Sequence, residues 1–160
     1  MIVTNSPFRL IVLMTSLVIV QGCTTIPSPL QGEFNEFYPE QAVERSAGAQ
    51  VRWGGTIIRT LPENDQTCIE ILARQLDPSY RPISSDQTFG RFLACRSVFI
   101  DPEVFVNDRQ VTITGAITGF SEQAIGEFTY RYPVVQAEAI YLWPEYIDVW
   151  RGRHYPYYWW

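Results

Sequence analysis

The chain has 160 residues, with 12 basic and 17 acidic side chains and a formal net charge of −5 at pH 7. A chain of this length is expected to form one domain. Because an acidic protein is repelled by nucleic-acid phosphates and by anionic headgroups, we expect neither nucleic-acid binding nor electrostatic membrane binding.

The first predicted element is an export signal. Residues 10–20 (LIVLMTSLVIV) form an apolar run, which fits the core of a signal peptide and is shorter than the roughly 18 residues that span a bilayer. The following Val20-Gln21-Gly22-Cys23 resembles the lipobox of bacterial lipoproteins, which implies cleavage before Cys23 and a diacylglycerol on its thiol. Thr24, rather than Asp, implies the outer membrane. The alternatives are an ordinary cleaved signal and a buried strand with a chance cysteine.

Two short elements are expected between the signal and the main domain. Residues 24–32 (TTIPSPLQG) are uncharged and contain two prolines, which is typical of a semi-extended tether. A short helix is predicted from Pro39, a favoured first helical residue, to Ala47, before Gly48. The predicted organisation is a signal peptide at 1–22, the tether and helix at 23–49, a barrel domain at 50–144 and an aromatic tail at 145–160.

From Gln50 onward, short runs rich in β-branched and aromatic residues alternate with turn residues, which predicts an all-β domain. Gly54-Gly55 predicts a bulge or sharp coil in the first strand. Asp101 and Pro102 predict the start of a short helix after the third strand, and Gly119 and Ser121 predict the end of the fourth. Strands are expected at 51–60, 66–76, 88–100, 109–118, 124–131 and 134–142, with the last two separated or kinked at Pro133.

Five or six antiparallel strands, with a short helix between the third and fourth, predict a small OB-like barrel that is closed or partly open. A two-sheet sandwich is the alternative. Glycines in the first and fourth strands favour the barrel, because a small barrel must coil tightly there.

Cysteine usage leaves one pair after modification of Cys23. Cys68 and Cys95 could form a disulfide in an oxidising periplasm, contributing on the order of 3 kcal/mol. Two free, buried cysteines are the alternative.

A set of motifs through the mature chain is similar to the Slp family. Members of that family are starvation- and stationary-phase-inducible outer-membrane lipoproteins of Gram-negative bacteria, so the resemblance implies an outer-membrane location and a role in envelope stress. It supplies no catalytic or ligand residues. Asp108, where the family tends to have glycine, and the cysteines at 68 and 95 depart from the family pattern. The motifs are Val51-Arg52-Trp53-Gly54-Gly55, Gly90-Arg91-Phe92, Phe99-Ile100-Asp101-Pro102, Arg109 to Gly119, Ile125-Gly126-Glu127, Tyr132-Pro133-Val134-Val135 and Tyr141-Leu142-Trp143-Pro144.

Residues with catalytic chemistry are few and scattered. His154 is the only histidine, so we expect no metal site and no serine-hydrolase triad, and we expect no cofactor. Glu70, Asp101 and Glu127 lie in separate predicted elements, so no acid–base pair can be identified.

The C-terminal tail is dense in aromatic residues, which favour membrane interfaces and partner contacts. Packing of the tail over the barrel is the alternative. The candidate contact residues are Trp150, Tyr155, Tyr157, Tyr158, Trp159 and Trp160.

Together these features predict a non-catalytic outer-membrane lipoprotein, held by lipid on Cys23 and facing the periplasm, with an unidentified envelope protein or glycan as a candidate partner. One alternative is a glycan- or small-ligand-binding module, which requires a groove lined by Arg and aromatic side chains. A second is a cell-wall hydrolase, which requires two convergent carboxylates at a cleft.

Overall fold

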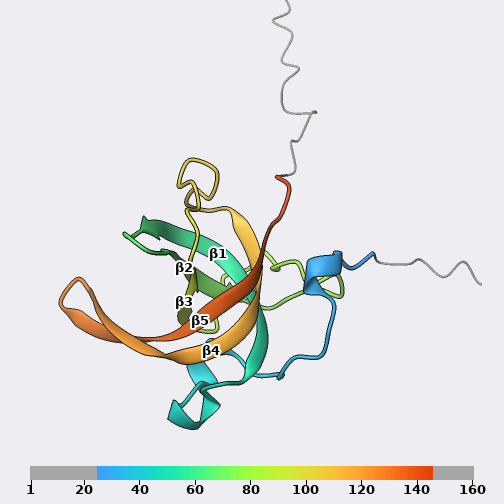
Figure 1. Ribbon diagram of the computed structural model, residues 1–160. Coiled ribbons are helices and arrows are strands. Elements are labelled where there is room, and N and C mark those ends of the chain that lie inside the picture. Colours follow the sequence, from blue (N-terminus) through green and yellow to red (C-terminus); the bar gives the residue numbers. More distant parts are fainter. Residues whose placement is uncertain (1–24, 146–160) are drawn as a thin grey trace, which may run out of the picture.

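The computed structural model describes residues 25–145, which form a five-stranded closed barrel (Figure 1). The all-β prediction and the choice of a barrel over a sandwich are confirmed. Among the residues described, no helix is long and apolar enough to cross a membrane. The strands are β1 (Gln50–Pro62), β2 (Thr67–Arg74), β3 (Arg91–Arg96), β4 (Gln110–Ile125) and β5 (Phe128–Leu142).

The strand order around the barrel is β1-β2-β3-β5-β4, with β4 pairing back to β1. All neighbouring pairs are antiparallel except β3 and β5, which run parallel over a short register centred on Ala94 and Val135. A five-stranded Greek-key barrel of this kind is the OB arrangement that the strand count predicted.

The last two strands are longer than the sequence predicted. β4 continues past Gly119 and Ser121 to Ile125, with a register shift between Ile117 and Gly119, and the turn at 126–127 joins it to β5. The predicted break at Pro133 is also wrong, because β5 is continuous through it. Pro133 directly precedes Val134, the first β5 residue that pairs with β3, so its missing amide proton falls before that ladder begins.

Neither predicted helix forms as expected. The segment from Pro39 to Ala47 contains two single 3-10 turns, η2 (Pro39–Gln41) and η3 (Glu44–Ser46), because the extended Ala42 between them is buried against the barrel core. After β3, the amides of Val104 and Phe105 bond back to Asp101, but only one turn results. The carbonyl of Phe105 accepts a hydrogen bond from Thr60 instead of continuing a helix.

The glycines in β1 and β4 allow neighbouring strands to approach closely. The predicted bulge at Gly54-Gly55 is not observed. The register of β1 shifts between Ile57 and Arg59, not at Gly54-Gly55. A Cβ atom on Gly55 would lie 2.0 Å from the carbonyl oxygen of Leu72, and one on Gly115 would lie 2.1 Å from that of Gln136. Any side chain at either position would therefore force neighbouring strands apart.

The barrel interior holds the main hydrophobic core. Trp53 belongs to this core, with ring centroids 5.3 Å from Phe92 and 5.7 Å from Phe37, and its indole donates to the carbonyl of Phe37 at 2.6 Å. The other buried core members include Val51, Ile57, Ile69, Ile71, Ala73, Ala94, Val111, Ile113, Ile117, Val135 and Ala137.

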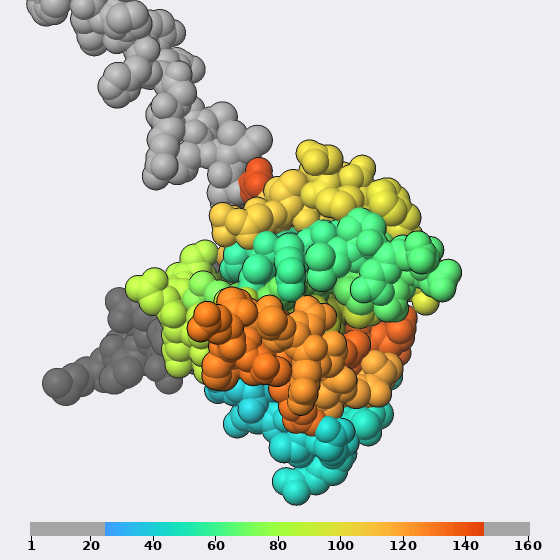
Figure 2. Space-filling model, turned by 90° about the vertical axis from the view of Figure 1, so that its left-hand side faces the viewer, coloured from blue at the N-terminus to red at the C-terminus, as the bar shows by residue number. Residues whose placement is uncertain are grey.

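A second, smaller cluster lies on the outside of β2 and β3. Because side chains alternate along a strand, Ile69 and Ile71 enter the barrel while Cys68 and Glu70 point outward. The outer surface is covered by the β4–β5 hairpin, whose Tyr132 is fully buried. Figure 2 shows this side of the molecule, with the hairpin in orange beside the green residues of β1 and β2.

Candidate functional site

Two clusters of polar groups in the described chain are candidates for a functional site. One is the buried cluster around Glu70, between the outer face of β2 and the β4–β5 hairpin. The other is a pocket beneath residues 30–38, the N-terminal segment that crosses the barrel before η2; we call this segment the strap.

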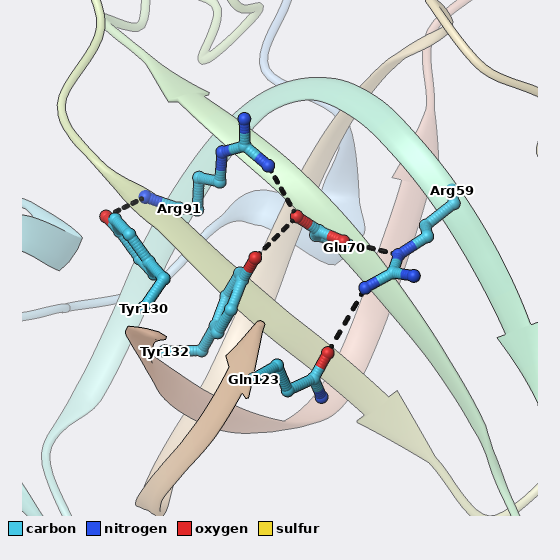
Figure 3. A network of polar contacts seen from close by, with 6 residues as sticks. All are labelled: Arg59, Glu70, Arg91, Gln123, Tyr130 and Tyr132. Carbon is cyan, nitrogen blue, oxygen red and sulfur yellow. Dashed lines mark hydrogen bonds and ion pairs between the residues drawn. The ribbon is translucent and has the colours of Figure 1, made fainter. Parts of the chain in front are cut away.

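Glu70 is the centre of the first cluster (Figure 3). Its carboxylate is buried and accepts three hydrogen bonds, from Arg59 Nε at 2.5 Å, Arg91 Nη1 at 2.9 Å and the Tyr132 hydroxyl at 2.8 Å. These donors come from β1, β3 and β5, so one side chain on β2 joins four strands. Both carboxylate oxygens are engaged.

A further pair of contacts extends the network along the hairpin. Arg59 also donates to the Gln123 side chain on β4 at 3.2 Å, and the Tyr130 hydroxyl accepts from the backbone amide of Arg91 at 3.0 Å. In Figure 3 the two tyrosines point from β5 toward Arg91 and Glu70. The hairpin is thus attached to β1 and β2 by charge-assisted hydrogen bonds and to β3 by a hydrogen bond between neutral groups.

The environment sets the charge states in this cluster. Burial raises the pKa of Glu70, but the hydrogen bonds from Tyr132, Arg59 and Arg91 together outweigh it, so the net pKa is lowered and the carboxylate is ionised. Burial and the neighbouring carboxylate raise the pKa of Tyr132, which keeps its hydroxyl protonated as a donor. The cluster is a fixed ion network, with an ionised acceptor and protonated donors.

Cys68 and Cys95 lie beside this network and form a disulfide. They are direct cross-strand partners on β2 and β3, with Cα atoms 4.0 Å apart. Both are buried together with Leu93 and Tyr132 under the hairpin. The bond therefore crosslinks the two strands on which the hairpin rests.

The strap pocket has a volume of about 500 Å³ and lies between the strap, the start of β1, the end of β2 and the loop that follows it. Its walls combine five aromatic rings with amide and charged side chains. Two lining cations, Arg52 and Arg74, are balanced by two lining carboxylates, Glu36 and Asp77. The aromatic lining residues are Phe34, Phe37, Tyr38, Trp53 and Tyr80.

Arg52 fixes the strap to the barrel. Its Nη1 donates to the carbonyls of Leu30 at 3.0 Å and Gly32 at 3.4 Å, while its guanidinium lies 3.3 Å from the ring centroid of Tyr80 and 4.8 Å from that of Phe34. Desolvation by burial lowers the pKa of Arg52, although such a group stays charged at neutral pH. Leu30 itself is completely buried.

The loop after β2 holds Tyr80 in place against Arg52. Asp77 Oδ1 accepts hydrogen bonds from Ser79 and from the amide of Arg81, and these bonds lower the pKa of Asp77 against the opposing effect of burial. Tyr80 has a left-handed φ of +67°, unusual for a residue with a side chain, and its carbonyl accepts from Thr112 at 2.7 Å. Such local strain is found where a side chain must be held in one direction.

Only some of the predicted site residues lie within the described part of the chain. Cys23, His154 and the aromatic tail residues lie outside the described residues. Of the three carboxylates considered for acid–base chemistry, Glu70 is buried in the ion network, whereas Asp101 and Glu127 are exposed on separate loops, so the structure does not bring them together. Within residues 25–145, no group of three His, Cys, Asp or Glu side chains could hold a metal ion.

Sequence reasoning missed the residues that build both sites. The sequence predicts no site role for Arg52, Arg59 or Arg91, whose partners lie up to 64 residues away in the chain. One signal was present: Arg52 and Arg91 are each within a motif of the family resemblance, as is Tyr132.

Comparisons with known proteins agree on a family. A family model described as "Outer membrane lipoprotein Slp family" matches residues 20–160. An uncharacterized lipoprotein, YeaY, of Escherichia coli K12 is 29% identical over 89% of this chain and 82% of its own length. An uncharacterized protein of Haemophilus influenzae is 31% identical over 76% of this chain and 69% of its own length.

Two further similarities were found. The outer membrane protein Slp of Escherichia coli K12 is 29% identical over 78% of this chain and 69% of its own length. Among solved structures, a small single-stranded DNA-binding protein from Streptomyces coelicolor matches with a TM-score of 0.39 and 14% identity, covering 66% of this chain and 98% of that one.

Proposed function

Because the chain belongs to the Slp family of outer membrane lipoproteins, we propose that it is a non-catalytic lipoprotein, anchored by acyl chains on Cys23, whose barrel faces the periplasm. The observation that carries this proposal is the family match, which begins at residue 20 and so includes Cys23. Multiple acyl chains give a durable anchor, since each buried CH₂ contributes about 0.8 kcal/mol.

The contacts of Glu70, the buried candidate for acid–base chemistry, support the proposal that the protein is non-catalytic. Both oxygens of Glu70 are bound by protein donors, and its lowered pKa opposes a role as a general acid at neutral pH. The family resemblance further supports a role in the starvation and stationary-phase envelope, which predicts higher protein abundance in stationary than in growing cells.

Intact mass spectrometry of the membrane-extracted protein tests the anchor. We expect a mass that corresponds to a chain beginning at Cys23 plus a glycerolipid and acyl chains, and co-fractionation with the outer membrane. The Cys23→Ala variant is the matched control and should yield no lipidated species. A wild-type protein that starts at another residue, or that carries no fatty acid, would overturn the anchoring.

Orientation needs a separate test. Protease added to intact cells should leave the barrel uncut, whereas the same protease should reach it after the outer membrane is permeabilised. Digestion in intact cells at the rate seen in permeabilised cells would place the barrel on the outside and contradict a periplasmic orientation.

A second candidate function is binding of a neutral glycan in the strap pocket, favoured by the composition of its walls. The two lining cations and two lining carboxylates leave no net charge to attract an ion. Both arginines already donate to backbone carbonyls, Arg52 on the strap and Arg74 at Ser85 and Gln87. The lining also carries aromatic rings and the amide side chains of Asn35, Gln41 and Gln75, and groups of these two kinds suit the faces and hydroxyls of a sugar ring.

Titration with a neutral N-acetylhexosamine disaccharide, followed by NMR of the backbone amides, tests this second function. We expect saturable shifts confined to residues that line the pocket and weakened at least tenfold by Phe34→Ala. Phe128→Ala, which removes an exposed phenylalanine at the start of β5, is the matched control and should leave binding unchanged. Absence of saturable shifts, or equal effects of the two variants, would reject the glycan site.

A further inference from the structure

The connection between the proposed anchor and the barrel is short, because the strap is fixed from Leu30 onward. Leu30 is completely buried, Arg52 binds the carbonyls of Leu30 and Gly32, and Asn35 bonds to Gln50 through both its amide and its side chain. The semi-extended tether predicted at 24–32 therefore ends before Leu30, and only residues 24–29 connect Cys23 to the folded body.

The free part is shortened further by local structure. Ser28–Leu30 forms the 3-10 turn η1, the Pro29 carbonyl lies 3.5 Å from the Thr114 hydroxyl on β4, and the Gln31 side chain donates to the carbonyl of Ile26 at 3.0 Å. Even fully extended, the seven steps from Cys23 to Leu30 reach at most about 25 Å. A folded body of this size is about 35 Å across.

Because the connection from Cys23 to Leu30 is short, the place where the strap joins the barrel decides which end of the barrel can lie near the membrane. In Figure 1, η1 and the start of the strap lie at one end of the barrel, while the β1–β2 turn and the β4–β5 turn project from the opposite end. If either turn touched the bilayer, Leu30 would stand nearly the full width of the body from its surface. The connection cannot span that distance.

We propose that the end of the barrel carrying η1 and the strap is the surface that faces the phospholipid bilayer, with the β1–β2 and β4–β5 turns directed away from it. The inference rests on the proposed anchoring through Cys23. It follows that the strap pocket opens in the half of the molecule nearest the membrane, whereas the exposed Phe128 and the acidic β1–β2 turn face partners in the aqueous compartment.

The membrane-extracted, full-length protein can be tested in phospholipid nanodiscs that contain a gadolinium-labelled headgroup lipid. We expect strong paramagnetic broadening of the backbone amides at residues 26–33, and little at residues 63–66 and 126–129. An insertion of twelve Gly and Ser residues between Thr25 and Ile26 lies before the contacts of η1 and the strap. It should reduce the difference in broadening between the two ends at least twofold.

The outcomes separate the two proposals. Intact mass of the same sample reports the acyl chains. An unacylated Cys23 would overturn the anchoring and, with it, the orientation. Acylated protein with equal broadening at both ends, or with stronger broadening at the turns, would overturn the orientation alone. Protein that begins at residue 24, and so lacks both the signal segment and the acyl chains, should show no broadening at either end when it is mixed with the same nanodiscs.

Discussion

The hydroxyl of Tyr132 donates a 2.8 Å hydrogen bond to the carboxylate of Glu70, which lies 62 residues earlier in the chain and on a strand that is not a neighbour of β5 in the barrel. This contact, made across the outer face of β3, attaches the β4–β5 hairpin to the body. It also explains why a charged side chain is buried outside the main core.

Replacing Glu70 with glutamine should lower the free energy of unfolding by about 3 kcal/mol, because it leaves Arg59 and Arg91 without their shared anion. Chemical denaturation monitored by tryptophan fluorescence measures this change. The control, Glu127→Gln at the exposed β4–β5 turn, should change stability by less than about 0.5 kcal/mol. Equal effects of the two substitutions would show that the network contributes nothing to the fold.

Stability should fall on acidification through Glu70. Since its folded pKa is lowered, its contribution is complete above the unfolded value of about 4.3 and is lost as pH falls through the folded pKa. Denaturation curves between pH 7 and pH 3 should therefore show the wild type losing more stability than Glu70→Gln. A gap between the two proteins that stays constant with pH would contradict the lowered pKa.

Removing the disulfide should destabilise the protein by on the order of 3 kcal/mol, as expected for a crosslink between residues 27 positions apart. The Cys68→Ala, Cys95→Ala double variant is the direct test, with chemical reduction of the wild type as its counterpart. Thiol titration of the unfolded, unreduced protein checks the bond itself. Two free thiols at these positions would show that it does not form.

Gly55→Ala should cost about 2 kcal/mol or more, because the new methyl group overlaps the Leu72 carbonyl in the adjacent strand. Gly126→Ala, in the β4–β5 turn, has nothing within 4 Å and should cost only about 1 kcal/mol for its left-handed φ of +61°. Thermal unfolding of the two variants measures both losses of stability, the first from steric overlap between strands and the second from backbone strain. A smaller loss for Gly55→Ala would contradict the strand spacing.

Asp108 has a left-handed φ of +67°, a backbone conformation that glycine adopts most readily. Asp108→Gly should therefore be tolerated to within about 0.5 kcal/mol, whereas Asp108→Ala should cost about 1 kcal/mol, since alanine lacks the local tolerance of aspartate for this conformation. Chemical denaturation distinguishes them. An alanine variant as stable as the glycine variant would remove the conformational explanation.

The sequence by itself determined the fold class and the positions of most strands. The alternating apolar pattern in 51–60 and 109–118 specifies one buried face, and glycines at 55 and 115 permit the tight approach that a small barrel requires. The lipobox-like segment and the ordered motifs also identified the family, because these are local patterns that survive without knowledge of the fold.

Only the tertiary structure decided where the polar residues act. The ends of the strands, the absence of the two predicted helices and the continuity of β5 depend on tertiary contacts. One example is the hydrogen bond from Thr60 to the carbonyl of Phe105, which local sequence preferences do not predict. The same holds for the two sites. The sequence predicts no site role for Arg52 or Tyr132 and no partner for Glu70. Their roles arise because barrel closure and hairpin folding bring groups distant in the chain within hydrogen-bond reach.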